Sequence, residues 1–354
     1  INRGNSHGNK VYLILEKPGS YNQVTYLPGH FYDSTEVCYE GPWIMGANGI
    51  GALSFDKKRI KSIEANYASF PANLQLFPRN DNNKAIVKIE GTVWTKGLDK
   101  AICRIYKNEV LYETIEKELI YSNDRAAFAF NPEINAELAE YTIETAFMAN
   151  GKSVDDRKAH NIVCGDVFLI NGQSNSHPTR QSAIYKNEYC RSFGSNTNYD
   201  AYNPADTTWG LAAGDVSRQY HVSAWGIKLM EQIVEQYKVP VCIINGGSGG
   251  SNIAYNLPKE NTNDLSSTYN RLLYRTKKAK VDNAVKAILW HQGESDSNED
   301  RYANYEKNFD QLHAAWNKDY PSIKKVFVFQ IHPGCGGARQ SEIRETQRRF
   351  KDKY

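Results

Sequence analysis

The sequence lacks the features that mark several classes of protein. Its 43 basic and 40 acidic residues give a formal net charge of only +3, so charge offers no argument for a nucleic-acid partner. No apolar run approaches the length of a membrane span, and no signal peptide is recognisable. The 6 cysteines include no Cys-x-x-Cys pair, which argues against a metal site. We therefore predict neither a metal nor another cofactor.

The chain is long, and it is rich in aromatic residues. Its 354 residues are long for one hydrophobic core and sufficient for two. The 23 tyrosines and 6 tryptophans suit stacking on sugars, and they suit the core of a β-sandwich equally well. Cys242 lies in an apolar run and is predicted to be a free buried thiol, while a bridge between Cys38 and Cys103 stays open.

The most informative stretch is an apolar run that ends abruptly at a serine, Asp-Val-Phe-Leu-Ile-Asn-Gly-Gln-Ser-Asn-Ser at residues 166–176. Its Val-Phe-Leu-Ile core is typical of a parallel strand covered on both faces, and ligands bind beyond the carboxyl ends of such strands. Gly172 would permit a sharp turn, and a helix starting near Asn175 would direct amide N–H groups at whatever Ser174 attacks. Ser174 is therefore the candidate nucleophile, with a helix-capping serine as the alternative.

Three further strand-like runs each stop at a polar or glycine-rich segment: residues 239–245, 285–290 and 325–331. The segments that follow them are residues 246–252, 291–296 and 332–334. Apolar residues at helical spacing lie between the strands, at residues 222–237 and 302–316. This alternation predicts an α/β fold with a doubly wound parallel sheet, whose polar strand ends gather at one edge.

Five short blocks resemble one family by their order: Gly-Gln-Ser-Asn at 172–175, Ser-Ala-Trp-Gly at 223–226, Gly-Gly-Ser-Gly-Gly-Ser-Asn-Ile at 246–253, Trp-His-Gln-Gly-Glu-Ser at 290–295 and Arg-Glu-Thr-Gln at 344–347. They follow one another as in the sialate O-acetylesterase and acetylxylan esterase branch of the SGNH hydrolases. The resemblance covers roughly residues 161–354. It implies a flavodoxin-like serine esterase that removes acetyl groups from sialic acid or from a plant or host polysaccharide through an acyl-enzyme. It also implies secretion, or export to a periplasm.

The resemblance assigns roles to individual residues. The serine of the first block is the family's nucleophile, which corresponds to Ser174. A glycine of the third block and the glutamine of the fourth line the oxyanion hole, which corresponds to Gly249 or Gly250 and to Gln292. These assignments suit the chemistry, because a tetrahedral oxyanion needs two or three fixed hydrogen-bond donors. A flexible turn is the alternative for the glycines.

The general base is not evident in the sequence. A catalytic serine needs a histidine held by a carboxylate, and the resembling family supplies this pair as Asp-x-x-His after a further strand. The chain ends at Tyr354 without that motif, so we expect it to lack a C-terminal strand and helix. Among the histidines present, His332 is the best substitute, and a substrate contact is its alternative role. Asn252 and Glu294 are likewise expected at the substrate, with Glu294 mainly supporting its own loop.

The N-terminal half has a different pattern. Residues 1–82 are rich in Tyr, Gly, Asn and Pro and predict strands and turns. Residues 83–160 alternate apolar runs with turn signals, as in a small β-sandwich, and residues 161–354 form the hydrolase domain. We expect the sandwich to pack against the hydrolase, with glycan binding as the alternative.

Two functions from different classes remain open. The first is a serine O-acetylesterase acting on acetylated carbohydrate. The second is a glycan-binding protein on the same fold that has lost its base and its activity. A lipase or thioesterase on this fold is a weaker third alternative. An Asp-x-x-His after a further strand would separate the first two.

Overall fold

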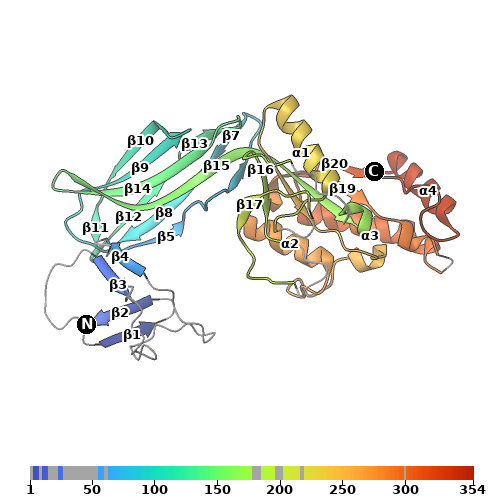
Figure 1. Cartoon of the computed structure of the whole chain (residues 1–354), viewed down its shortest axis with the longest axis horizontal. Coiled ribbons are helices and arrows are strands. Elements are labelled where there is room, and N and C mark those ends of the chain that lie inside the picture. The colour runs from blue at the N-terminus through green and yellow to red at the C-terminus, as the bar shows by residue number, and fades with distance from the viewer. Residues whose placement is uncertain are drawn as a thin grey trace, which may run out of the picture. The chain divides into compact units, whose positions relative to one another are not determined.

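The computed structural model describes residues 3–7, 10–14, 23–26, 55–59, 63–177, 185–195, 202–215, 219–298 and 300–354. The chain, drawn in Figure 1, divides into two compact units. The first comprises Ile1–Asn66 and Val93–Lys96, and the second comprises Tyr67–Thr92 and Gly97–Tyr354. Within the described ranges, no helix combines the length and the apolar character needed to cross a membrane.

The described residues of the first unit form two antiparallel strand pairs. Strand β1 (Arg3–His7) pairs with β2 (Lys10–Ile14), and β3 (Gln23–Tyr26) pairs with β4 (Phe55–Arg59). The described backbone here is extended, as the sequence pattern predicts. Cys38 lies outside the described residues, while Cys103 and Cys242 are free buried thiols.

Mostly antiparallel strands follow, with these bounds: β5 (Ala65–Ser69), β6 (Leu76–Pro78), β7 (Lys84–Ile86), β8 (Ile89–Val93), β9 (Lys100–Lys107), β10 (Val110–Glu118), β11 (Tyr121–Ser122), β12 (Arg125–Phe130), β13 (Glu133–Asn135) and β14 (Tyr141–Ala149). One sheet has the order β11-β12-β8-β5, and β10, β9 and β14 adjoin in another. Buried Phe128 and Phe130 alternate with exposed residues along β12. Phe128 meets Phe147 of β14 edge to face, with ring centroids 5.3 Å apart. The two sheets therefore share an aromatic core.

Strand β15 (Lys152–Gly172) belongs to both halves of the second unit. Its first part pairs antiparallel with β14, Val163–Gly165 pair with β6, and its last part pairs in parallel with strands of the α/β sheet. At about 3.3 Å per residue, a straight strand of 21 residues would span roughly 70 Å. The predicted domain boundary between residues 160 and 161 falls inside this strand, so backbone pairing continues across it.

The α/β sheet adds five strands: β16 (Cys190–Phe193), β17 (Trp209–Leu211), β18 (Val241–Asn245), β19 (Val285–His291) and β20 (Lys325–Val328). The strands adjoin in the order β17-β16-β18-β15-β19-β20, and every pair is parallel except β16 with β17. The four strands predicted from apolar runs are all present; the short β16 and β17 were not predicted. The chain runs from β15 to β18 on one side and then to β19 on the other, so the carboxyl end of β15 is a topological switch point.

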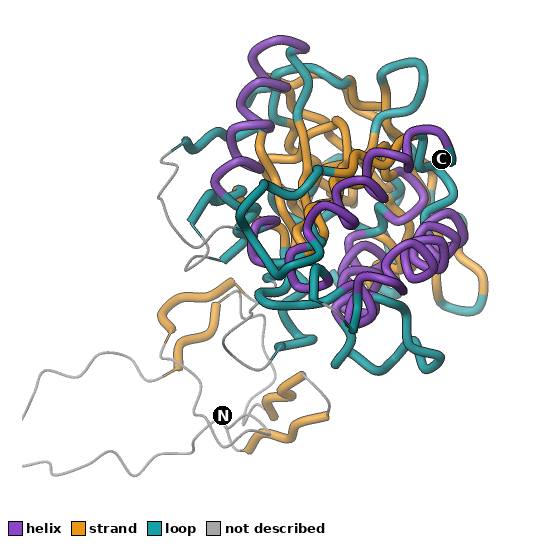
Figure 2. Tube along the Cα trace, turned by 90° about the vertical axis from the view of Figure 1, so that its right-hand side faces the viewer, coloured by secondary structure: helices purple, strands orange, loops and turns teal. Residues whose placement is uncertain are grey.

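Among the described residues, four α-helices flank this sheet: α1 (Ala224–Tyr237), α2 (Thr268–Ala279), α3 (Tyr305–Asp319) and α4 (Gln340–Arg349). Figure 2 shows helices on both sides of the strands. Ile170 of β15 packs in one core with α1, and its neighbour Leu169 packs in the other with α2, α3 and α4. Both faces of β15 are therefore covered, which explains its uninterrupted apolar run.

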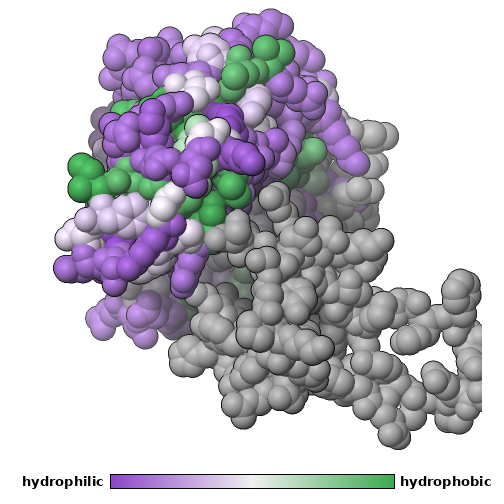
Figure 3. Space-filling model, turned by 90° about the vertical axis from the view of Figure 1, so that its left-hand side faces the viewer, coloured by the Kyte–Doolittle hydropathy of each residue, from purple (hydrophilic) through white to green (hydrophobic). Residues whose placement is uncertain are grey.

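The surface on the side drawn in Figure 3 is mainly hydrophilic, in contrast to the apolar core on both faces of β15, and its hydrophobic side chains form separate patches. Exposed hydrophobic residues include Val110, Leu111 and Tyr112 of β10. Other exposed hydrophobic residues, such as Ile120, Tyr237 and Tyr255, lie apart along the chain, and single exposures of that kind are normal for a folded protein.

Candidate active site

Ser174 lies just beyond the carboxyl end of β15, at the switch point of the sheet. It is exposed, and it begins a single 3₁₀ turn, η1 (Ser174–Ser176). The prediction of a helix starting near Asn175 is wrong within the described residues, since a three-residue turn carries no substantial helix dipole. Gly172 has φ +140°, and a Cβ there would lie 2.1 Å from the carbonyl oxygen of His291. Glycine is therefore required where the strand turns toward Ser174.

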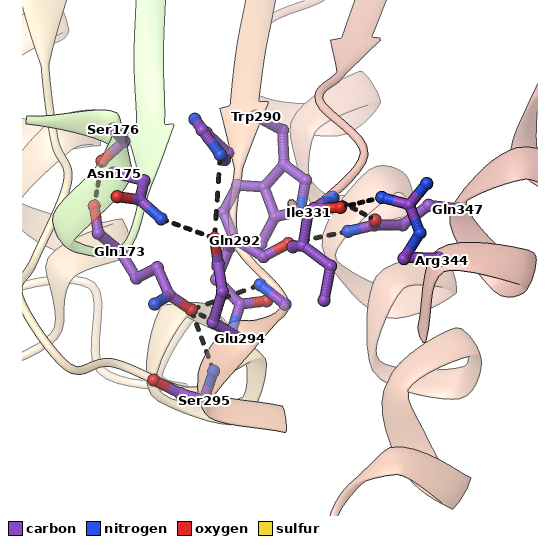
Figure 4. Close-up of polar contacts among 12 residues, drawn as sticks. Gln173, Asn175, Ser176, Trp290, Gln292, Glu294, Ser295, Ile331, Arg344 and Gln347 are labelled. Carbon is purple, nitrogen blue, oxygen red and sulfur yellow. Dashed lines mark hydrogen bonds and ion pairs between the residues drawn. The ribbon is translucent and has the colours of Figure 1, made fainter. Parts of the chain in front are cut away.

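Gln173 joins the serine turn to the loop that follows β19. Its side chain is buried, and Oε1 accepts hydrogen bonds from Gln292 Nε2, Gly293 N and Ser295 N at 3.3, 3.2 and 3.1 Å. Figure 4 shows this oxygen directed at the residues around Gln292 and Ser295. One carbonyl oxygen thus fixes the loop beside the predicted nucleophile. Gln173 was not singled out from the sequence, although it is part of the Gly-Gln-Ser-Asn block.

Asn175 makes a second connection to the same loop. Its Nδ2 donates to Glu294 Oε1 at 2.5 Å, and its carbonyl oxygen accepts a hydrogen bond from Trp225 Nε1 at 3.0 Å. Glu294 is 6% exposed, and among the described residues its Oε2 has no hydrogen-bond partner. Burial lowers the pKa of His291, an effect that the Glu294 carboxylate, 3.8 Å from His291 Nε2, partly offsets. The Glu294 carboxylate therefore supports the serine turn, whereas among the described residues no amide of its own loop donates to it.

The glycine-rich segment after β18 is tied to the end of β15. Ser248 N donates to the carbonyl oxygen of Gly172 at 3.0 Å. Gly247 packs against the serine turn so closely that a Cβ would lie 2.0 Å from Ser176 Oγ. Asn245 holds this arrangement, because its Nδ2 donates to Ser176 O at 3.0 Å and its Oδ1 accepts from Gly247 N at 2.8 Å. The segment is a fixed turn beside Ser174, and the glycine that approaches the serine turn closely is Gly247.

Gly249 and Gly250 form the exposed tip of this turn. Within the described part of the chain, neither amide N–H donates a hydrogen bond. Gly250 has φ +69°, and its carbonyl oxygen accepts a hydrogen bond from Ser295 Oγ at 3.2 Å. The two amides are therefore open to a ligand, on a turn held to the neighbouring loop.

Gln292 faces the interior. It is fully buried, and its Nε2 donates to Asp296 Oδ2 at 2.5 Å and to Ser251 O at 3.3 Å in addition to Gln173. The carboxamide N–H groups are thus engaged within the protein, so in this structure Gln292 binds three loops together instead of facing a ligand. Asp296 also accepts a hydrogen bond from Ile253 N at 2.8 Å, and burial raises the pKa of this carboxyl group.

The Arg-Glu-Thr-Gln block of α4 supports the loop that carries Gln292. Gln347 Nε2 donates to the carbonyl oxygen of Gln292 at 2.8 Å, and Gln347 Oε1 accepts from Ile331 N at 3.0 Å. Arg344 donates to the carbonyl oxygen of Ile331. Figure 4 shows both α4 side chains directed toward Ile331 and Gln292. This block therefore positions the ends of β19 and β20.

Arg275 of α2 is a further support that sequence reasoning missed. It is fully buried, and its guanidinium donates to carbonyl oxygens of Phe193, Gly194 and Asn245 at 2.7 to 3.0 Å. Burial lowers the pKa of Arg275 to about 10. The residue clamps the carboxyl ends of β16 and β18. No sequence signal distinguishes it from the lysines that follow it on the same helix.

The remaining predicted residues lie near the edge of the site. Asn252 is half-buried, and its Oδ1 caps η2 (Ile253–Asn256) by accepting from Tyr255 N at 2.9 Å. His332 is exposed beyond β20. Among the described residues, no histidine ring nitrogen is hydrogen-bonded to Ser174 Oγ, and no cluster of His, Cys, Asp or Glu could hold a metal ion.

The sequence was compared with family models and with curated proteins. The family model described as "Carbohydrate esterase, sialic acid-specific acetylesterase" matches residues 164–353, more than half of the chain. No curated protein sequence matches.

Solved structures give a likeness of fold. A carbohydrate acetylesterase from Xanthomonas citri is 16% identical with a TM-score of 0.50, and the match covers 82% of this chain and 66% of that one. A protein from Arabidopsis thaliana is 19% identical with a TM-score of 0.41, covering 51% of this chain and 79% of that one. The protein NanS is 15% identical with a TM-score of 0.39, covering 53% and 74%. At these identities, the first match shows a shared esterase fold, and this chain spans 66% of that protein's length.

Proposed function

Because the chain belongs to the carbohydrate esterase family of sialic acid-specific acetylesterases, which are carboxylic ester hydrolases, we propose that it removes O-acetyl groups from carbohydrate with Ser174 as the nucleophile. One observation carries this proposal: Ser174 is exposed at the switch point of a parallel sheet, between two loops that are hydrogen-bonded to its own turn. We also assign the sheet to the flavodoxin-like SGNH type, since β18, β15, β19 and β20 adjoin in the order 2-1-3-4 when β16 and β17, which extend the sheet beyond β18, are left out of the numbering.

The proposed reaction has two steps through an acyl-enzyme. Ser174 Oγ attacks the acetyl carbonyl carbon, its proton passes to a base, and the sugar alcohol leaves with a proton as the ester C–O bond breaks. Water then attacks the acetyl-serine and releases acetate. The products are one deacetylated sugar hydroxyl and one acetate for each water consumed.

The exposed amides are suited to the charge that develops in both steps. The carbonyl oxygen becomes an oxyanion, and fixed N–H donors stabilise it more than they stabilise the substrate. We assign this role to the backbone N–H of Ser174 and to the amides at Gly249 and Gly250, which donate to no other described residue. Their turns are held by Gln173 and Asn245, so the donors are already oriented before the substrate binds.

The substrate contacts are assigned to the residues that rim this turn. Asn252 Nδ2 and the exposed ring of His332 are suited to sugar hydroxyl groups, because each can donate a hydrogen bond at the surface of the site. Glu294 Oε2 has no partner in the described structure, but it is buried, so a sugar hydroxyl group reaches it only if the loop that carries it moves.

A glycan-binding protein without catalytic activity is the second candidate. One observation favours it: within the described residues, no imidazole nitrogen is bonded to Ser174 Oγ to take its proton. The two candidates differ in a direct way, since only the first releases acetate.

The test is acetate release from 4-nitrophenyl acetate and from an acetylated disaccharide. Ser174→Ala should lower kcat/KM by at least about a thousandfold, because the nucleophile is lost while the fold is kept. The matched control is Ser153→Ala, a change to an exposed serine at the other end of β15, which should leave turnover unchanged. Turnover of Ser174→Ala at the wild-type rate would remove Ser174 from the mechanism. No acetate release by the wild-type chain would favour the glycan-binding candidate.

A further inference from the structure

A cavity of about 530 Å³ lies on the antiparallel sheet, formed by residues of β9, β14, β15 and the turn after β9. None of the residues that line it belongs to the site around Ser174. Its volume falls within the range of small-molecule binding sites. Its lining is mostly polar, so it is not a void left by imperfect core packing.

The floor of this cavity combines an aromatic ring with a hydroxyl group. Tyr106 of β9 and Thr142 of β14 are direct partners in the sheet register, so their side chains stand side by side on one face. Lys158 of β15 completes the floor, with its Nζ 5.4 Å from the centroid of the Tyr106 ring. In the described structure the Thr142 and Tyr106 hydroxyl groups have no hydrogen-bond partner.

Two asparagines on the wall present opposite ends of their amides. Asn108 Oδ1 accepts from the backbone N of Glu140 at 3.0 Å, which leaves its Nδ2 donor without a partner among the described residues. Asn161 Nδ2 donates to Glu140 Oε2 at 2.7 Å, which leaves the Asn161 Oδ1 acceptor without a partner among the described residues. One residue, Glu140, therefore orients a donor on one side and an acceptor on the other.

The wall is fixed in this conformation. Glu140 Oε1 accepts a hydrogen bond from Arg191 Nη2 at 2.9 Å, and the Arg191 side chain is fully buried. Asn161 has φ +57° at a β-bulge where the register between β14 and β15 shifts, and Asn108 has φ +48° in the turn after β9. Asparagine tolerates this left-handed backbone well, and bulges redirect side chains. Both amides are therefore held in place before any ligand arrives.

We propose that this cavity is a carbohydrate-binding site that takes one or two sugar rings. A sugar diol offers a hydroxyl that donates beside a hydroxyl that accepts, and the Asn108 donor with the Asn161 acceptor matches that pair. The Thr142 hydroxyl and the Tyr106 side chain add a further polar contact and an aromatic surface. Because Glu140 and Arg191 hold the wall, binding requires little ordering of side chains. A peptide fits less well, since the lining contains no aliphatic side chain that would form an apolar pocket, and its two rings are those of Tyr106 and His160.

The experiment is ligand-observed NMR on the full chain with cellobiose, xylobiose, lactose and N,N′-diacetylchitobiose, each at up to about 10 mM. We expect at least one disaccharide to bind. Asn108→Asp keeps the acceptor for Glu140 N but replaces the free donor by oxygen, and Thr142→Val removes one hydroxyl at nearly constant shape. Each change should weaken binding by roughly tenfold.

Two controls locate the binding. Thr114→Val, on the exposed edge strand β10 outside the cavity, should bind the sugar as the wild-type chain does. Ser174→Ala should also bind it unchanged, so the result does not depend on the proposed reaction. The proposal is overturned if no disaccharide binds, or if binding survives both cavity variants. It is also overturned if acetyl-glycyl-glycine amide binds in place of every sugar, which would assign the cavity to a peptide.

Discussion

Gln173→Ala is the perturbation that tests the architecture of the site most directly. The change leaves Ser174 in the sequence and removes only the side chain that joins its turn to the loop after β19. Gln173 Oε1 is the acceptor for Gly293 N and Ser295 N at 3.2 and 3.1 Å. Gln292 Nε2 also loses this acceptor but keeps Ser251 O and Asp296 Oδ2.

The magnitude follows from the two backbone donors that are left without an acceptor. An unsatisfied buried N–H costs about 1 to 3 kcal/mol. Gly293 is buried and Ser295 is half-buried, so water can reach only the second. We therefore expect a loss of about 3 kcal/mol in the free energy of unfolding, which corresponds to roughly 4 °C in melting temperature for a chain of 354 residues. We also expect kcat to fall by about a hundredfold, because the turn that carries Ser174 loses its alignment.

The assay is thermal unfolding by circular dichroism together with acetate release at saturating substrate. Gln173→Glu is the matched variant, because it keeps an oxygen at the Oε1 position and nearly the same shape. It should retain more than half of the stability that Gln173→Ala loses. Equal melting temperatures for Gln173→Ala and the wild type would refute the reasoning, since the three hydrogen bonds would then contribute nothing.

Two further predictions concern buried side chains. Burial lowers the pKa of His177 from 6.5 to about 4, so the unfolded chain takes up this proton before the folded protein does, and stability should fall by about 3 kcal/mol as the pH drops from 6.5 to 4. Melting curves across that range check this, and His177→Gln should show a shallower decline; an equally steep decline would count against it. Arg275→Met should lower the free energy of unfolding by about 3 kcal/mol in urea, because three buried carbonyl oxygens lose their donor. Arg271→Met, a change to a half-buried arginine of the same helix with one such bond, should cost about 1 kcal/mol, and equal costs would contradict the proposed clamp.

The parallel sheet could be predicted because its central strands are covered on both faces. Burial of that kind leaves continuous apolar runs, and Ile243 and Ile244 of β18 are both fully buried. Strand β10 shows the opposite case: eight of its nine residues are exposed, so no alternation marks it, and only its pairing with β9 makes it a strand. Helix α2 was missed for a related reason, because its buried positions include Asn270, Arg275 and Thr276. Polar residues that find partners in the fold look like surface residues in the sequence.

In the candidate site, too, some features could be predicted from the sequence and others could not. Ser174 could be placed because a strand end and a turn are local features of the sequence. The orientation of Gln292 could not, because its amide binds Gln173 and Ser251, which are 119 and 41 residues away along the chain. A 3₁₀ turn over residues 174–176 stands where the start of a helix was expected, and this turn packs against Gly247 and Asn245. Local patterns identify the residues of such a site, and distant partners decide which way each one faces.

The continuity of β15 has a consequence for how this protein can be divided. A cut near residue 160 would separate β14 from β18 and β19, which use the same strand as their partner. It would also strip the buried guanidinium of Arg191 of its acceptors at Leu74 and Glu140, which belong to the N-terminal side. A buried charge that loses its carboxylate partner is strongly destabilising. The antiparallel sheet therefore cannot be transplanted, deleted or released by a protease as a cassette, and any swap of parts between related proteins has to carry β15 whole.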